Sequence, residues 1–252
     1  MTPFQPKILR YESVSSTNNE VAQLASRGAE EGTVIVADEQ TAGRGRLQRT
    51  WSSPKGAGLY FSILLRPKIS QDRWSLITFM AALAVSDALQ EACELETEIK
   101  WPNDLLAGER KICGILAEVI EAETGRAIVL GIGINLTSEA YPAELVGQAV
   151  SVAELTPRLV EREEILAALL RALTQRYEGL TEPDGTTRVI EEWMSRSSYG
   201  EGKLVRVNNG VERLTGITRG LEKDGALRLE IENGVIRTIR AGDVVQVRAE
   251  NK

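Results

Sequence analysis

The sequence contains no histidine among its 252 residues. This absence excludes Ser-His-Asp and Cys-His catalysis, and it excludes every metal site that uses histidine ligands. Any chemistry must therefore use carboxylates, lysine, arginine, backbone amides or a metal that the substrate brings. Nucleotidyl transfer suits these groups, because its catalysis is mostly positioning and charge stabilisation.

Cysteine and long apolar runs are also scarce. The two cysteines, Cys93 and Cys113, are too few for a disulfide framework and lack the spacing of a zinc finger. No apolar run approaches the roughly 18–20 residues that span a bilayer. Residues 1–10 contain no signal-peptide core. We therefore expect a cytoplasmic protein that does not associate with membranes.

Composition and charge are those of an ordinary globular protein. Hydrophobic residues make up 42% of the chain and charged residues 26%, which excludes a disordered or fibrous class. The net charge of −6 and the pI near 5.1 argue against bulk binding of nucleic acid. The length suits a large domain with a small one. We expect a catalytic domain over residues 1–199 and a second domain over residues 200–252.

A glycine- and arginine-rich loop over residues 40–58 is the most distinctive segment. It separates two apolar runs, residues 33–37 and 59–65, that predict buried strands. It contains no acidic residue, and its glycines let the backbone approach a ligand closely. Arginine offers a planar fork of donors that matches carboxylates and phosphates, so the loop is either an anion clamp or a solvated connection. Its basic residues are Arg44, Arg46, Arg49 and Lys55.

The triplet Ser16-Thr17-Asn18 precedes a predicted helix that extends to Gly28. Thr17 at the N-cap and Glu20 three residues later have the spacing of a capping box. The triplet can serve as a cap and nothing more. A helix N-terminus also favours electron-rich ligand groups, so capping and ligand contact can share these residues.

The segment Lys100-Trp101-Pro102-Asn103-Asp104 predicts the end of a strand. Pro102 lacks a backbone N–H and ends the strand, and Asn-Asp favours a turn. Lys100 then lies at the strand end, beside a rigid corner. It is either a solvated residue or a cation held in place for a ligand.

Two further strands are predicted over residues 111–119 and 127–136, with turns at residues 107–110 and 123–125. The second contains Gly131-Ile132-Gly133, which lacks the third glycine of a dinucleotide-binding fingerprint and lies inside a strand. No Walker A motif is present in the sequence. ATP would have to be bound by another architecture.

Helical and strand patterns complete the chain. Apolar residues at helical spacing predict helices over residues 72–94, 162–177 and 187–196, and Ser151 with Glu154 forms a capping box. After residue 200, short segments of alternating apolar and polar residues, separated by Asn-Gly and Asp-Gly turns, predict a small SH3-like barrel. Considered by itself, such a barrel could equally be a module that binds a peptide or RNA. Its predicted strands are residues 203–208, 211–218, 226–230, 235–239 and 243–248.

Taken together, these motifs resemble those of biotin protein ligases. The resemblance rests on Gly43-Arg44-Gly45-Arg46 with the following Arg49 and Trp51, on the Ser-Thr-Asn triplet and on Lys-Trp-Pro-Asn-Asp. It also includes a Lys-x-x-Gly-Ile-Leu segment from Lys111 and a Gly-Ile-Gly-Ile-Asn segment that ends at Asn135. The resemblance implies an α+β fold. Its catalytic domain is similar to class II aminoacyl-tRNA synthetases, with a mixed sheet, flanking helices and a C-terminal SH3-like barrel.

The resemblance also implies a reaction in two steps. Biotin and ATP, with Mg²⁺, would form biotinyl-5′-AMP and release pyrophosphate. A lysine of the biotin carboxyl carrier domain of an acyl-CoA carboxylase would then attack this adenylate. The glycine/arginine loop would order over the intermediate and exclude water. Magnesium would arrive with ATP and not through a site made of protein ligands alone.

Residue roles follow from the same resemblance. Lys100 and Arg46 would be catalytic, and Asp104 would position magnesium or the acceptor lysine. Gly114 would allow flat approach of biotin, and Asn135 would hydrogen-bond adenine. The residues implied in biotin binding are Ser16, Thr17, Asn18, Gln40, Gly43, Arg44, Gly45, Arg46, Lys100 and Gly114. Those implied in binding ATP or the adenylate are Arg44, Arg46, Arg49, Trp51, Lys100, Lys111 and Asn135.

Some features depart from the family pattern or leave alternatives. Gln48 stands where many relatives have glycine. Separately, only about seven residues precede the first predicted motifs of the catalytic domain, which leaves no room for a DNA-binding domain, so we expect no repressor function. A homodimer could form through exposed strand edges near residues 131–135. The alternatives to a biotin ligase are a lipoate or octanoate ligase or transferase of the same fold, a non-catalytic module that binds an adenylate or peptide and, third, a nucleic-acid-binding protein.

Overall fold

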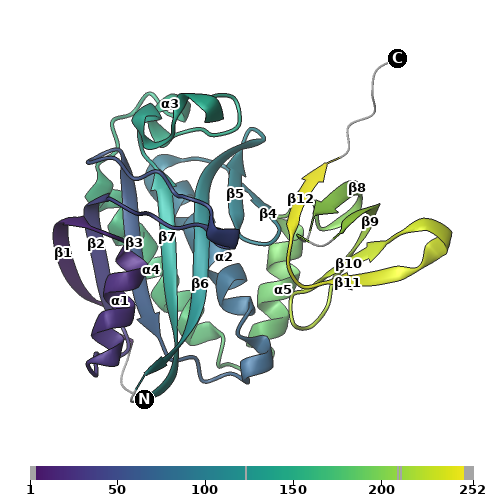
Figure 1. Ribbon diagram of the computed structural model, residues 1–252, viewed down its shortest axis with the longest axis horizontal. Helices are drawn as coiled ribbons and strands as arrows, with labels where there is room; N and C mark the ends of the chain where they lie inside the picture. Colours follow the sequence, from purple (N-terminus) through teal and green to yellow (C-terminus); the bar gives the residue numbers. More distant parts are fainter. Residues whose placement is uncertain (1–3, 123, 209, 211, 247–252) are drawn as a thin grey trace.

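A seven-stranded mixed sheet forms the centre of the molecule (Figure 1). The computed structural model describes residues 4–122, 124–208, 210 and 212–246. The strand order is β1-β2-β3-β7-β6-β5-β4; β1 and β2 are parallel, and every other neighbouring pair is antiparallel. The strands are β1 (Lys7–Val14), β2 (Thr33–Gln40), β3 (Gly58–Leu65), β4 (Glu98–Lys100), β5 (Asp104–Ala107), β6 (Arg110–Ala122) and β7 (Gly125–Asn135).

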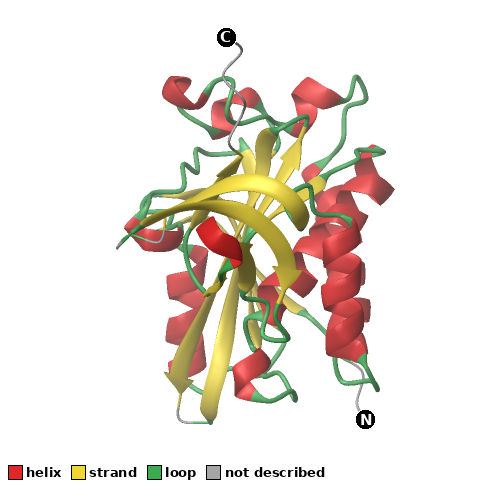
Figure 2. Ribbon diagram, turned by 90° about the vertical axis from the view of Figure 1, so that its right-hand side faces the viewer, coloured by secondary structure: helices red, strands yellow, loops and turns green. Residues whose placement is uncertain are grey.

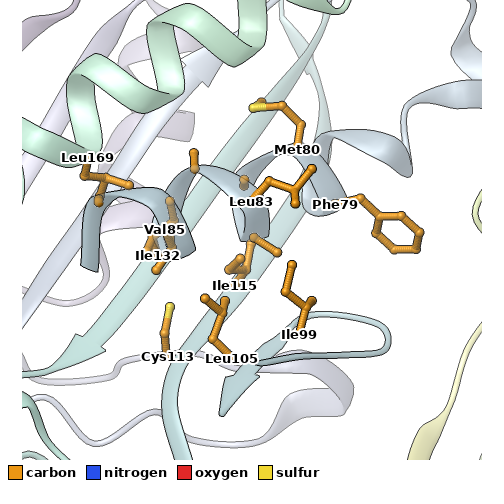
Figure 3. Packing of buried hydrophobic residues seen from close by; sticks show 14 of the residues in the cluster. Phe79, Met80, Leu83, Val85, Ile99, Leu105, Cys113, Ile115, Ile132 and Leu169 are labelled. Atoms are coloured by element: carbon orange, nitrogen blue, oxygen red, sulfur yellow. The ribbon is translucent and has the colours of Figure 1, made fainter. Parts of the chain in front are cut away.

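Helices cover both faces of this sheet (Figure 2). On one face, α1 packs Val21 and Ala25 against Ile35, Leu64 and Val129. The long helix α2 packs on the other face together with α4, and Figure 3 shows side chains of α2 meeting those of β6 and β7. Because both faces are covered, β3 is buried along its whole length. The helices are α1 (Thr17–Ser26), α2 (Leu76–Cys93), α3 (Val152–Leu155), α4 (Arg162–Gly179) and α5 (Gly185–Ser195).

Helix α2 is long and apolar enough, by length and composition, to cross a membrane. Polar residues such as Ser86 and Asp87 interrupt its apolar residues, so the sequence shows no continuous apolar run of this length. In the structure, 78% of the 18-residue window is buried inside the protein. Its apolar character is therefore that of a core helix packed against the sheet and α4.

The second domain is a five-stranded antiparallel sheet of SH3-like character with the order β11-β10-β9-β8-β12. Within the described residues, the strand pairings leave this sheet open and do not close it into a full barrel. The indole of Trp101 donates to Gly225 O at 3.1 Å and ties the two domains together. The strands are β8 (Glu201–Asn208), β9 (Arg213–Leu221), β10 (Leu227–Glu230), β11 (Ile236–Ile239) and β12 (Asp243–Gln246).

The predicted secondary structure is largely confirmed, with shifted ends. The capping box of Ser151 and Glu154 is present, because the Glu154 carboxylate accepts from Ser151 N–H at 2.9 Å. The predicted turn at residues 123–125 and the predicted strand from residue 211 include residues outside the described part of the chain, as does the Asn209-Gly210 turn. The boundary at residues 199 and 200 stays a prediction.

Two predictions were wrong. The N-cap of α1 is Ser16 and not Thr17, because Ser16 has extended backbone angles and Thr17 already begins the helix. The side chain of Ser16 forms no capping hydrogen bond, so the capping box predicted with Glu20 does not form. Gly131 to Asn135 is no free edge either, since β7 pairs with both β3 and β6. A homodimer through that segment is excluded, and a homodimer through another surface stays a prediction.

Candidate active site

Three glycines form the floor of the site on the α1 face of the sheet. Gly114 of β6 lies opposite Gly133 of β7. Gly131, two residues before Gly133, lies on the same face of β7. A Cβ atom at Gly131 would lie 2.1 Å from Asn18 Oδ1, and one at Gly133 would lie 2.5 Å from the Trp51 ring. The side chains of Asn18 and Trp51 therefore rest directly on backbone that only glycine can provide.

The predicted biotin-head triplet is buried, and its Thr17 is hydrogen-bonded to Gln40. Ser16, Thr17 and Asn18 are each under 5% exposed. Gln40, at the end of β2, accepts from Thr17 N–H at 2.9 Å and lies 3.1 Å from the Thr17 hydroxyl. Gln40 Nε2 donates to Ser53 Oγ at 2.8 Å. The structure therefore brings these four predicted residues together and adds Ser53.

Sequence reasoning missed Ser62, which lies at the bottom of this network. Its side chain is fully buried on β3, and its Oγ lies 2.7 Å from Thr17 Oγ1 and 2.6 Å from Asn18 Oδ1. The sequence did contain a signal for Ser62, because it is a polar residue inside the otherwise apolar run of β3. A buried hydroxyl must have partners, and in a strand covered on both faces these partners come from a packed helix.

The glycine/arginine loop folds back on itself beside the network. Gly45 N–H donates to Arg49 O at 2.7 Å, and Trp51 N–H donates to Gly43 O at 2.9 Å. At its tip, Leu47 and Gln48 both have left-handed backbone angles, with φ of 54° and 60°. Gln48 thus has the backbone conformation that glycine adopts most easily.

The arginines of the loop have different partners. Arg44 forms a two-point ion pair with Glu118, at 2.9 and 2.6 Å. Arg46 donates to Asn103 Oδ1 at 3.0 Å, and burial lowers its pKa from the ordinary value. Arg49 forms an ion pair with Asp243 of the second domain. Among these three arginines, and within the described residues, Arg46 is thus the one whose hydrogen-bond acceptors are neutral, Asn103 Oδ1 and Gly242 O.

Trp51 is placed between the glycine floor and Lys111. The Lys111 ammonium lies 5.2 Å from the centroid of the Trp51 ring and 2.7 Å from Asp104 Oδ1. Asp104 is thus paired with Lys111 in the structure, and its predicted role with magnesium or the acceptor lysine stays a prediction. The buried indole nitrogen of Trp51 has no hydrogen-bond acceptor within the described part of the chain.

Asn135 ends β7 on the same face as the glycine floor. It is 3% exposed, and its Nδ2 donates to Val150 O at 3.1 Å and to Lys111 O at 3.3 Å. The donors of its amide are therefore used by the main chain. Its predicted hydrogen bond to adenine stays a prediction and would have to use Oδ1.

Lys100 ends β4 directly opposite Asp104 and is half-buried. Among the residues that the structure describes, it forms no ion pair, in contrast to Arg44, Arg49 and Lys111. The turn that follows it is tied down on two sides. Asn103 accepts from Arg46 and donates to Ile115 O at 2.8 Å. This turn thus connects the predicted catalytic lysine to the glycine/arginine loop.

A cleft of about 650 Å³ adjoins the site between the two domains. Arg46, Asn103 and Glu118 line it from the catalytic domain, and Asp224 and Arg240 line it from the second domain. Within residues 4–122, 124–208, 210 and 212–246, no group of three or more cysteine, aspartate or glutamate side chains is placed to hold a metal ion.

Comparison with known proteins identifies this architecture. Residues 11–135 match the Biotin/lipoate A/B protein ligase family, and residues 202–246 match the Biotin protein ligase C terminal domain. The fold is similar to that of a biotin protein ligase from Aquifex aeolicus in complex with biotin and ATP. That similarity has a TM-score of 0.82 and 31% identity, and it covers 96% of this chain and 99% of the other. The fold is that of the biotin/lipoate class of protein ligases.

Two sequence relatives narrow the class. A biotin–[acetyl-CoA-carboxylase] ligase of Mycobacterium tuberculosis is 34% identical over 239 residues, which cover 92% of this chain and 86% of the relative. A bifunctional ligase/repressor BirA of Bacillus subtilis is 34% identical over 241 residues, which cover 94% of this chain and 73% of the relative. The chain belongs to the biotin protein ligase family.

Proposed function

We propose that this protein joins biotin and ATP into biotinyl-5′-AMP and transfers the biotinyl group to a lysine of a biotin carboxyl carrier domain. In the first step, a carboxylate oxygen of biotin attacks the α-phosphorus of ATP, and the bond to pyrophosphate breaks. In the second, the neutral lysine amine attacks the acyl carbon, the bond to AMP breaks and the amine loses a proton. The product is an amide.

The observation that carries the proposal is the buried polar network above the glycine floor. The network of Thr17, Asn18, Gln40 and Ser62 has hydroxyl and amide groups within hydrogen-bond distance of one another. The ureido ring of biotin has two N–H donors and one carbonyl acceptor, which such groups can satisfy. An apolar acid would cover this network without using its remaining acceptor capacity, so the network favours a ligand head that can form hydrogen bonds.

Positive charge on the other side of the site suits the triphosphate. We assign Lys100 to the reacting centre, because its ammonium has no ion-pair partner among the described residues. Arg46 has neutral acceptors and is free to exchange them for phosphate oxygens. An ammonium and a guanidinium there would offset the repulsion between carboxylate and triphosphate and stabilise charge in the transition state. Magnesium would enter as the ion bound to ATP.

A lipoate or octanoate ligase is the second candidate, since the matched family includes lipoate as well as biotin protein ligases. ATP–pyrophosphate exchange with biotin, lipoate and octanoate in parallel distinguishes these activities. Exchange with biotin alone supports the proposal, and exchange with lipoate or octanoate alone would replace the substrate. No exchange with any acid would indicate a non-catalytic binding module. The cytoplasmic location and the absence of repressor activity and of nucleic-acid binding stay predictions.

A further inference from the structure

We propose that Glu118 is a positioning residue that joins the biotin-head triplet to the glycine/arginine loop and determines the affinity for biotin. This inference rests on the proposed function. Glu118 lies on β6, four residues after Gly114 and on the same face of the sheet. Its side chain is 31% exposed, so its contacts are partly shielded from water.

A single carboxylate holds two parts of the site. Oε1 of Glu118 accepts from Arg44 Nη1 at 2.9 Å, and Oε2 accepts from Arg44 Nη2 at 2.6 Å. Oε2 also accepts from Asn18 Nδ2 at 2.8 Å. Two-point pairs between arginine and carboxylate are geometrically specific. The position of the loop at Arg44 is therefore coupled directly to the position of Asn18 at the start of α1.

Glu118 also fixes which way the Asn18 amide points. An ionised carboxylate only accepts hydrogen bonds, so the NH₂ group of Asn18 must face Glu118. The Asn18 oxygen then faces Ser62 Oγ, 2.6 Å away. Nδ2 has a second acceptor in Leu116 O at 3.4 Å. The amide donors are thus used by the protein, and what Asn18 can offer a ligand is its oxygen, which suits a ureido N–H.

The same pair separates the roles of the two arginines. The Glu118 carboxylate compensates the charge of Arg44 within the protein. The hydrogen-bond acceptors of Arg46, in contrast, are the neutral Asn103 Oδ1 and Gly242 O. We thus assign Arg46 and Lys100 to the phosphates and Arg44 with Glu118 to the biotin head, whereas the family resemblance implied both ligands for both arginines. The loss of Glu118 should therefore affect biotin and leave ATP binding unchanged.

The test is the variant Glu118→Gln, assayed by ATP–pyrophosphate exchange with biotin and ATP varied in turn. Glutamine keeps the size of the side chain but turns an NH₂ group toward donors of Arg44 or Asn18. We expect the KM for biotin to rise about 10- to 100-fold, the factor for loss of a hydrogen bond to a charged group. The KM for ATP should not change. Glu118→Asp retains the charge and should recover part of the loss.

The matched control is Glu121→Gln on the same strand. Glu121 also pairs with an arginine, Arg126 at 2.6 Å, but its side chain is 71% exposed. This control should leave both KM values unchanged. An unchanged KM for biotin in Glu118→Gln, or equal rises for biotin and ATP, would overturn the proposal.

A second variant covers the case in which Glu118→Gln does not fold, as judged by thermal unfolding without ligand. Arg44→Met removes the other half of the pair and should raise the KM for biotin selectively. A rise in the KM for ATP instead would contradict the separation of roles. Absence of exchange in the parent protein would reject the proposed function and is thus distinct from failure of this inference.

Discussion

The side chain of Asn18 lies directly on the backbone of Gly131, at a point where a Cβ atom would be 2.1 Å from Asn18 Oδ1. The two residues come from α1 and from β7, in the middle of the sheet. This contact places the polar amide of Asn18 against the glycine floor of the site, on an otherwise apolar sheet. In the proposed function, recognition of the biotin head therefore depends on a residue without a side chain.

Replacing Gly131 with alanine should abolish tight biotin binding while the protein stays folded. The new methyl group must displace Asn18, which is 4% exposed and held by Ser62 and Glu118. Isothermal titration calorimetry with biotin measures the effect. Gly179→Ala is the matched control, because a Cβ atom there meets nothing within 4 Å. Parental affinity in Gly131→Ala would show that Asn18 does not contact the ligand.

Lys100→Met should strongly reduce adenylation. Methionine keeps much of the side-chain bulk and removes the charge that we place at the reacting centre. Losses of about 10²–10³ in kcat are typical when one group that stabilises the transition-state charge is removed. Pyrophosphate exchange at saturating biotin and ATP reports the effect. Lys68→Met, at an exposed position, should retain parental exchange. An exchange rate near that of the parent in Lys100→Met would remove Lys100 from the mechanism.

Arg46→Ala should release the intermediate. Arg46 connects the loop to Asn103 and to Gly242 of the second domain. Its removal should leave the fold intact but loosen the loop over the adenylate, so that biotinyl-AMP escapes into solution. The measurement is the fraction of biotinyl-AMP that co-elutes with the protein on rapid gel filtration. Retention equal to that of the parent would contradict the role of Arg46 in holding the adenylate.

Gln48→Gly should stabilise the ligand-free protein. Gln48 has a φ of 60°, and a left-handed backbone costs a residue with a side chain about 1–2 kcal/mol. Glycine removes this cost but gains about 0.4–1 kcal/mol of freedom in the unfolded chain, so we expect a net stabilisation of up to about 1.6 kcal/mol. Urea unfolding measures it.

The control for Gln48→Gly is the same substitution in a helix. Gln23 lies exposed in the middle of α1, where glycine should lower the free energy of unfolding by about 1 kcal/mol. The two substitutions should therefore have opposite signs. Destabilisation by Gln48→Gly as large as that by Gln23→Gly would mean that the left-handed conformation at residue 48 carries no strain.

Local features of the chain were predictable because their causes are local. The apolar runs before and after the glycine/arginine loop predicted β2 and β3, and Pro102 correctly marked the end of β4. The triplet at residues 16–18 was correctly placed at the start of a helix, although its cap was assigned to the wrong residue. Alternation, helical spacing and turn residues act within a few positions, so one sequence is enough to detect them.

The partners of the charged and polar side chains were decided only by the tertiary structure. Nothing near Arg44 in the sequence indicates Glu118, and Arg49 meets Asp243, which lies 194 positions away. The register of β6 against β7 sets Gly114 opposite Gly133, and the order of the strands places β7 at the centre of the sheet. Which carboxylate reaches which arginine depends on the pairing of distant strands and on domain contacts. The sequence alone thus determined which chemical groups are present, and long-range packing determined which of them remain free to act on a ligand.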